Sequence, residues 1–115
     1  METETMKEQH LMVLAIADEM ARMEQNLTSM PQETSGRKQL LRSLQRIKTH
    51  LMTAGYEVVE MLGQPYNDGM KVVASFKFDE TLPEGQQLIT SVIRPQVNYR
   101  GEMIQVAEII VSQNI

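Results

Sequence analysis

The hydrophobic pattern of the chain changes its period near residue 55, and this change constrains the fold more than any other feature. Before it, apolar residues recur every three or four positions, which is the repeat of an amphipathic helix. After it, short β-branched runs alternate with Gly and Pro, which is typical of strands joined by turns. The 115 residues suffice for a helical segment and one small domain. We therefore predict an α+β protein, with a helical part at 1–54 and a small all-β domain at 55–115.

The first helical pattern extends from about Met6 to Met30 and ends at Pro31 and a polar loop. A second pattern from about Arg37 to Ala54 has the same repeat and stops at Gly55, which can adopt the positive φ common after a helix. Two helices joined by so short a loop are expected to pack antiparallel as a helix hairpin. The apolar seam that we expect to be buried consists of Val13, Ile16, Met20, Met23, Leu27, Leu40, Leu44, Ile47 and Leu51.

The apolar stripe on the first helix is too wide for a single neighbouring helix. The chain has ten Met but only three Tyr and two Phe, so its core must be filled by aliphatic and thioether side chains. One hairpin of this kind buries little surface, whereas two hairpins form a four-helix bundle. We therefore expect a homodimer in which the seam residues of two copies pack together.

Five short strand patterns follow the helices, at residues 56–62, 72–78, 88–94, 97–99 and 103–111. The segment 72–78 alternates apolar and polar residues, as a half-buried strand does. Arg100 and Gly101 fit a two-residue hairpin turn, because Gly accepts a positive φ. The last segment is almost continuously apolar, so we expect it to be central. Five such strands predict a small barrel or sandwich.

The composition excludes several kinds of chemistry. Without cysteine there is no disulfide, thiolate nucleophile or cysteine-bound zinc, which agrees with a reducing cytoplasm. His10 and His50 lack a nearby metal-ligand partner, so we interpret them as surface or packing residues. No nucleophile elbow or phosphate-binding loop is present. We expect no enzyme activity, no metal and no cofactor, and we hold a small-ligand enzyme only as a remote alternative.

The charge pattern and hydropathy limit the partners. The formal net charge is -4 and the pI is about 5.1, which disfavours nucleic acid, although basic residues cluster on the second helix. That cluster is interpreted as a solvated face or a contact for an acidic protein. No apolar run reaches about 18 residues and the N-terminus does not look like a signal peptide. We therefore expect a cytoplasmic protein that does not bind a membrane.

Five local strings can be compared with known families: VLAIADEMAR at 13–22, LMTAGYEVV at 51–59, QPYNDGMKVV at 64–73, LPEG at 82–85 and YRGEMIQVAEIIV at 99–111. They cover most of residues 11–112 and follow the order of a helix hairpin and a small β-domain. These strings and their order resemble the GrpE family of nucleotide-exchange factors, and the order carries the resemblance more than any one string.

The resemblance implies a co-chaperone that binds the nucleotide-binding domain of a DnaK-type chaperone and promotes ADP release, with roles in protein folding and the stress response. It implies a four-helix bundle in a homodimer, with a β-domain that wedges the chaperone open. Carried over by position, the partner-facing residues are Gly55, Ile93, Glu102, Gln105 and Val111.

The chain departs from the family at three points. Only about ten residues precede the bundle helix, so we expect a short, divergent form that lacks the long N-terminal coiled coil. Glu102 and Gln105 stand where the family often has basic residues, and Gln96-Val97 replaces its Gly-Tyr/Phe. These changes favour either an exchange factor for one particular chaperone or, as the alternative, a dimeric adaptor of GrpE-like shape without exchange activity.

Overall fold

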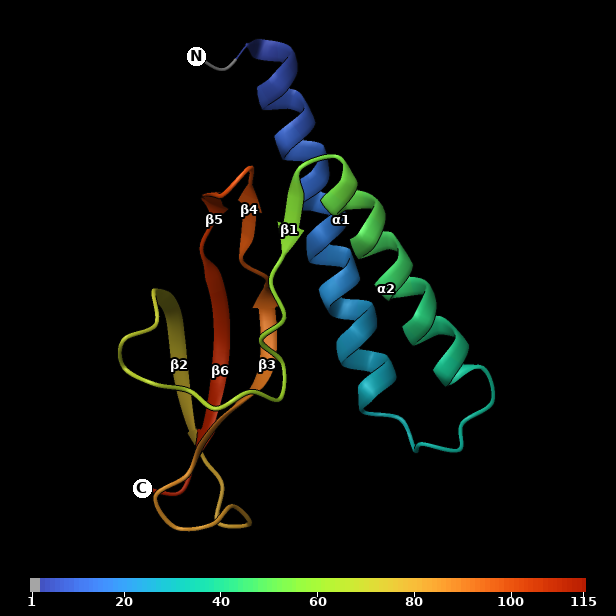
Figure 1. The fold of residues 1–115 in the computed structure, drawn as a ribbon. Coiled ribbons are helices and arrows are strands. Elements are labelled where there is room, and N and C mark those ends of the chain that lie inside the picture. Colours follow the sequence, from blue (N-terminus) through green and yellow to red (C-terminus); the bar gives the residue numbers. More distant parts are fainter. Residues whose placement is uncertain (1–2) are drawn as a thin grey trace.

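The computed structural model describes residues 3–115, which form two helices followed by six strands (Figure 1). Helix α1 spans Glu4–Thr28, and the Thr3 hydroxyl caps it by accepting a hydrogen bond from the backbone N–H of Met6. Helix α2 spans Arg37–Thr53 and follows Gly36, which adopts a φ of 83°. The two helices thus begin and end within a few residues of the positions expected from the sequence.

The helices contact each other through a small apolar cluster. Met20 and Leu27 of α1 are buried against Leu44 of α2, and two further leucines of α2 pack around them. In Figure 1 both helices lie on one side of the strands, next to β1 and β3, while β2 lies on the far side. The helical part is therefore attached along one flank of the β part.

The six strands form two three-stranded sheets. Sheet A has the order β1-β4-β5 and is antiparallel, and sheet B has the order β2-β6-β3 with β2 parallel to β6. The strand bounds are Tyr56–Val58 (β1), Val72–Phe78 (β2), Gln87–Arg94 (β3), Val97–Tyr99 (β4), Glu102–Gln105 (β5) and Ala107–Gln113 (β6).

Three strand expectations need correction. The expected strand at 56–62 is a strand only over its first three residues. The apolar segment at 103–111 is not one strand, because the chain leaves sheet A at Val106 and continues in sheet B. The result is two small sheets of three strands each rather than one five-stranded barrel or sandwich. Within sheet B, β6 lies between β2 and β3, so the central position expected for the last segment is confirmed for this part of it.

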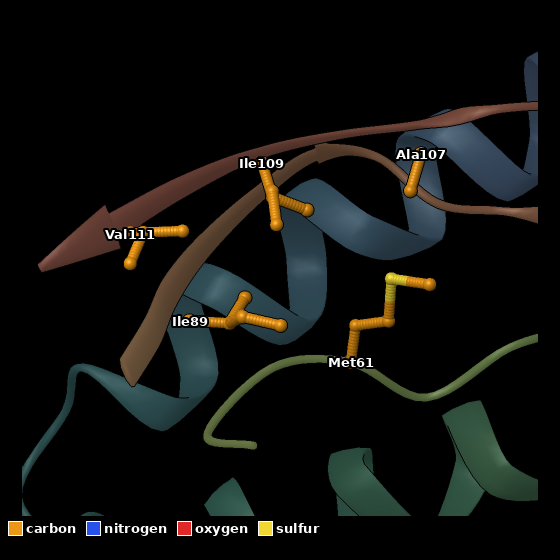
Figure 2. Close-up of a cluster of buried hydrophobic side chains, with 5 residues drawn as sticks. All are labelled: Met61, Ile89, Ala107, Ile109 and Val111. Carbon is orange, nitrogen blue, oxygen red and sulfur yellow. The ribbon is translucent and has the colours of Figure 1, made fainter. Parts of the chain in front are cut away.

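The largest core lies on one face of sheet B (Figure 2). Ile109 and Val111 of β6 and Ile89 of β3 have no exposed surface. Met61, from the segment after β1, extends toward them and closes the cluster together with Ala107. The buried residues of this core, and the partly buried ones packed against them, come from the strands and from segment 59–70, so α1 and α2 contribute none of them.

A second core joins α1 to sheet A. Val13 and Ala17 of α1 pack on Tyr56 of β1 and Val97 of β4, and all four are buried. The hairpin between β4 and β5 has the turn expected from the sequence, with φ of 48° at Arg100 and 86° at the following glycine. The described residues therefore form three small cores, one between the helices, one at sheet A and one on sheet B.

Candidate interaction surfaces

The side chains that could perform chemistry are scattered in the structure. Among residues 3–115, no group of three or more His, Asp or Glu side chains is arranged to hold a metal ion. His10 is buried, and its Nδ1 lies 2.5 Å from the Tyr56 hydroxyl, while its ring packs on Tyr99 with centroids 4.6 Å apart. His50 is exposed near the end of α2.

An apolar groove runs between the outer faces of α1 and α2. Its volume is about 350 Å³. Two of its lining residues are polar, Asn26 and Ser43, and the other six are apolar: Met23, Leu27, Met30, Leu40, Leu44 and Ile47. Met23 is 45% exposed and Leu40 is 54% exposed, which is unusual for side chains of this size when several lie together.

The structure divides the nine expected seam residues into two sets. Val13, Met20, Leu27 and Leu44 are buried within the single chain, and Leu51 packs beside them. The other four are exposed and lie along the groove or extend it toward the N-terminus: Ile16, Met23, Leu40 and Ile47. The second set is exposed and can contact another molecule, whereas of the first set only Leu27 and Leu44 line the groove.

The five expected partner-facing residues have different surroundings. Glu102, beside the β4–β5 turn, and Ile93, near the end of β3, are exposed. Val111 has no exposed surface, so it contributes to the core of sheet B in this conformation. Gln105 is half-buried, and its amide donates to Asp18 at 3.0 Å and to the Pro95 carbonyl oxygen at 2.9 Å.

Gly55 connects α2 to β1 and adopts a φ of 96°, in the left-handed region that favours glycine. A Cβ at this position would lie 3.2 Å from Cε1 of Tyr99 and 3.3 Å from Cγ of Arg100. The Gly55 carbonyl also accepts the backbone N–H of Arg100 at 2.9 Å. The positive φ therefore favours glycine here, and a Cβ would also make two tight contacts with side chains, whatever the role of Gly55 in partner contact.

Polar side chains attach the β part to the helices. Gln25 of α1 donates to the Thr90 carbonyl oxygen at 3.0 Å and accepts the backbone N–H of Val92 at 3.3 Å. Asp18, about two helical turns earlier, pairs with Arg94 at 3.8 Å in addition to its bond with Gln105. Sequence reasoning missed both roles, because the partners are more than 60 residues away.

Lys48 of α2 forms a second polar connection. Its ammonium contacts Glu24 of α1 at 2.7 Å and also pairs with Glu60, which follows β1. Burial acts to lower the pKa of Lys48, but the hydrogen bonds and charges of the two glutamates outweigh it, so that the pKa is raised above its usual value. Among the basic residues of α2, Lys48 is therefore engaged in ion pairs within the chain.

Comparison with known proteins assigns no family. No protein-family model matches the chain, and no curated protein matches it by sequence. Neither helix contains, within the described residues, a segment long and apolar enough to span a bilayer.

Proposed function

We propose that the chain is a GrpE-like co-chaperone that binds the nucleotide-binding domain of a DnaK-type chaperone and promotes ADP release. The element order supports this, because two helices are followed by a compact β part with two exposed positions, Ile93 and Glu102. The observation that carries the proposal is the placement of the apolar groove relative to the β part.

The apolar groove and the residues that attach the β part lie on nearly opposite faces of α1. Ile16 and Met23 belong to the exposed apolar stripe, and Asp18 and Gln25, two residues later in each case, bond to the β part. Two residues correspond to a rotation of about 200° around a helix. A second copy that packs into the groove would therefore leave each β part free to meet a chaperone.

The proposed mechanism involves no bond chemistry. The β part binds the open form of the nucleotide-binding domain more tightly than the closed form that holds ADP, and it shifts the population toward release. The shift is limited by the difference between the two affinities, about tenfold in population for each 1.4 kcal/mol. Glu102 and Ile93 are the contacts that we assign to this surface, because both side chains are exposed.

The test measures release of fluorescent ADP from DnaK-type chaperones encoded in the same genome. Acceleration that saturates with the concentration of this protein supports the proposal. Glu102→Arg should change the concentration needed for half-maximal acceleration for at least one chaperone, and Glu84→Arg, at an exposed site in the loop before β3, is the charge-matched control. Absence of both binding and acceleration with every chaperone would refute the proposal.

The adaptor without exchange activity is the second candidate, and the Gln105 contacts favour it. Where the family often has a basic residue, Gln105 is instead bonded within the chain to Asp18 and Pro95. An adaptor would bind a chaperone without changing the rate of ADP release. Binding by calorimetry together with an unchanged rate would therefore replace the first proposal by this one.

The homodimer is tested separately. Met23→Asp places a charge in the groove and should convert the protein to a monomer in analytical ultracentrifugation. Met52→Asp is the matched control, because Met52 is exposed on α2 but does not line the groove. A monomeric wild-type protein at micromolar concentration, or dimers in both variants, would contradict pairing through the groove.

A further inference from the structure

The two edges of sheet B differ in their protection. The outer edge of β3 is occupied: segment 63–66 makes three backbone hydrogen bonds with residues 87–89, and the Gln25 amide pairs with Thr90 and Val92. The opposite edge is formed by β2, which within the described part of the chain pairs with β6 alone. Among residues 3–115, no hydrogen bond from another segment reaches this outer edge. Figure 1 places β2 at the side of the molecule that faces away from the helices.

The bare edge is long and regular. All seven residues of Val72–Phe78 are in continuous register with β6, without a bulge or a proline. Val73 is 59% exposed and Phe78 is 63% exposed. Proteins usually block such an edge with charges, bulges, proline or a covering loop, because unpaired N–H and C=O groups recruit another strand. Here one lysine, Lys77, is the only charge in the strand.

We propose that β2 binds an extended segment of another protein by strand addition, with main-chain hydrogen bonds along the edge. This surface is separate from the groove on the helices and does not depend on exchange activity. The partner strand would make sheet B four-stranded and would cover the exposed side chains beside β2.

The side chains of β2 define the chemistry of the partner. Val73 and Lys77 lie on one face of the sheet, and Phe76 and Phe78 lie on the other. On this second face the ring centroids of Phe76 and Tyr66 lie 5.4 Å apart. A complementary strand therefore carries acidic residues on the first face and apolar residues on the second. A second copy of β2 offers no carboxylate, since the strand contains neither Asp nor Glu. Charge complementarity thus selects an acidic, alternating segment rather than self-pairing.

The test uses fluorescein-labelled nine-residue peptides and the full-length protein. The probe alternates Glu and Val, one control alternates Lys and Val, and a second control carries the probe sequence with alternate backbone nitrogens methylated. We expect saturable binding of the probe and at least fivefold weaker binding of the Lys peptide. The methylated control is made in two forms, one with the odd-numbered and one with the even-numbered nitrogens methylated, and at least one form should lose binding. In amide hydrogen exchange by NMR, the outward amides within 72–78 should exchange quickly in the free protein and become protected by the probe.

Lys77→Glu should reverse the preference between the two charged peptides. Lys38→Glu, an exposed lysine on α2, introduces the same charge change away from sheet B and should leave the preference intact. The proposal is overturned if the probe shows no saturable binding up to about 1 mM, if both peptides bind equally, or if protection appears at the helix groove instead. Protection of 72–78 that rises with protein concentration alone would assign the edge to a second copy and would also overturn it.

Discussion

Gln25 provides the most direct test of how the helices hold the β part. Both ends of its side-chain amide bond to the backbone of β3, next to a register shift in the pairing of β3 with β6. Gln25→Met removes both hydrogen bonds at nearly constant length. Gln25→Glu keeps an acceptor for the N–H of Val92, but it replaces the donor to Thr90 by a carboxylate oxygen. At neutral pH two acceptors then face each other in a half-buried site.

The expected losses follow from the two contacts. A typical intramolecular hydrogen bond contributes about 0.5–1.5 kcal/mol, so Gln25→Met should lower the free energy of unfolding by about 1–3 kcal/mol. Gln25→Glu should cost about 2 kcal/mol at pH 7, because it loses one bond and leaves the Thr90 carbonyl oxygen without its donor. Protonation of the introduced carboxyl restores a donor, so near pH 4 the deficit of Gln25→Glu relative to wild type should shrink to roughly half or less.

The measurement is urea unfolding followed by circular dichroism, at fixed protein concentration and at both pH values. Gln86→Glu is the matched control, because it makes the same substitution at an exposed position away from the helices, where only the backbone is hydrogen-bonded. We expect it to change stability by less than about 0.5 kcal/mol. If Gln25→Glu costs no more than Gln86→Glu at pH 7, the amide does not hold α1 to β3. A deficit that is the same at both pH values would show that packing, and not the lost donor, is responsible.

Three further predictions concern the junction of the helices with the strands. Lys48→Met deprives two glutamates of their shared ammonium and should lower the free energy of unfolding by about 1–3 kcal/mol in urea unfolding. Because the pKa of Lys48 is raised in the folded state, the wild-type protein keeps this contribution below pH 10.5 and loses it as the pH rises through the folded pKa. The stabilities of the two proteins should therefore converge at high pH. Tyr56→Phe removes the hydroxyl bonded to the buried His10 ring and should cost about 1–3 kcal/mol by the same measurement, whereas a neutral result would show that the ring packing alone suffices. Gly55→Ala combines a left-handed φ with a Cβ contact near 3.2 Å, so it should lower the melting temperature more than Gly85→Ala does. Gly85 has a similar φ, but a Cβ there would have no atom within 4 Å. Equal shifts in melting temperature would exclude a steric effect at Gly55.

Local chemistry made several elements predictable from the sequence. Pro31 and Gly55 lie just beyond the ends of the two helices, as their backbone preferences require. The alternation of Val72–Phe78 predicted β2 with its observed bounds. The turn at Arg100 and Gly101 was predictable, because only a few residue types accept positive φ at adjacent positions. These signals all lie within a few residues of the structure that they specify.

The long-range arrangement was not predictable in the same way. The segment 103–111 has one continuous apolar pattern, yet its two halves pair in different sheets, and nothing in that pattern marks Val106 as the crossing point. The hydrogen bonds between α1 and the β part were not predictable either, since Gln25 and Asp18 look like ordinary solvated positions on a helix. Their roles depend on strand backbone and side chains that reach them only after the chain has folded.

The heptad repeat of α1 shows why one pattern can specify two different contacts. A seam with alternating spacings of three and four covers a wide strip of a helix, and the strip here is divided between neighbours. Val13 and Met20 face the interior of the chain, whereas Ile16 and Met23 are exposed beside them. Each of the three cores is small, and the core between the helices is open along the groove. Covering that groove would therefore stabilise the helices themselves, so that in the proposed dimer association and helix packing would be one thermodynamic event rather than two.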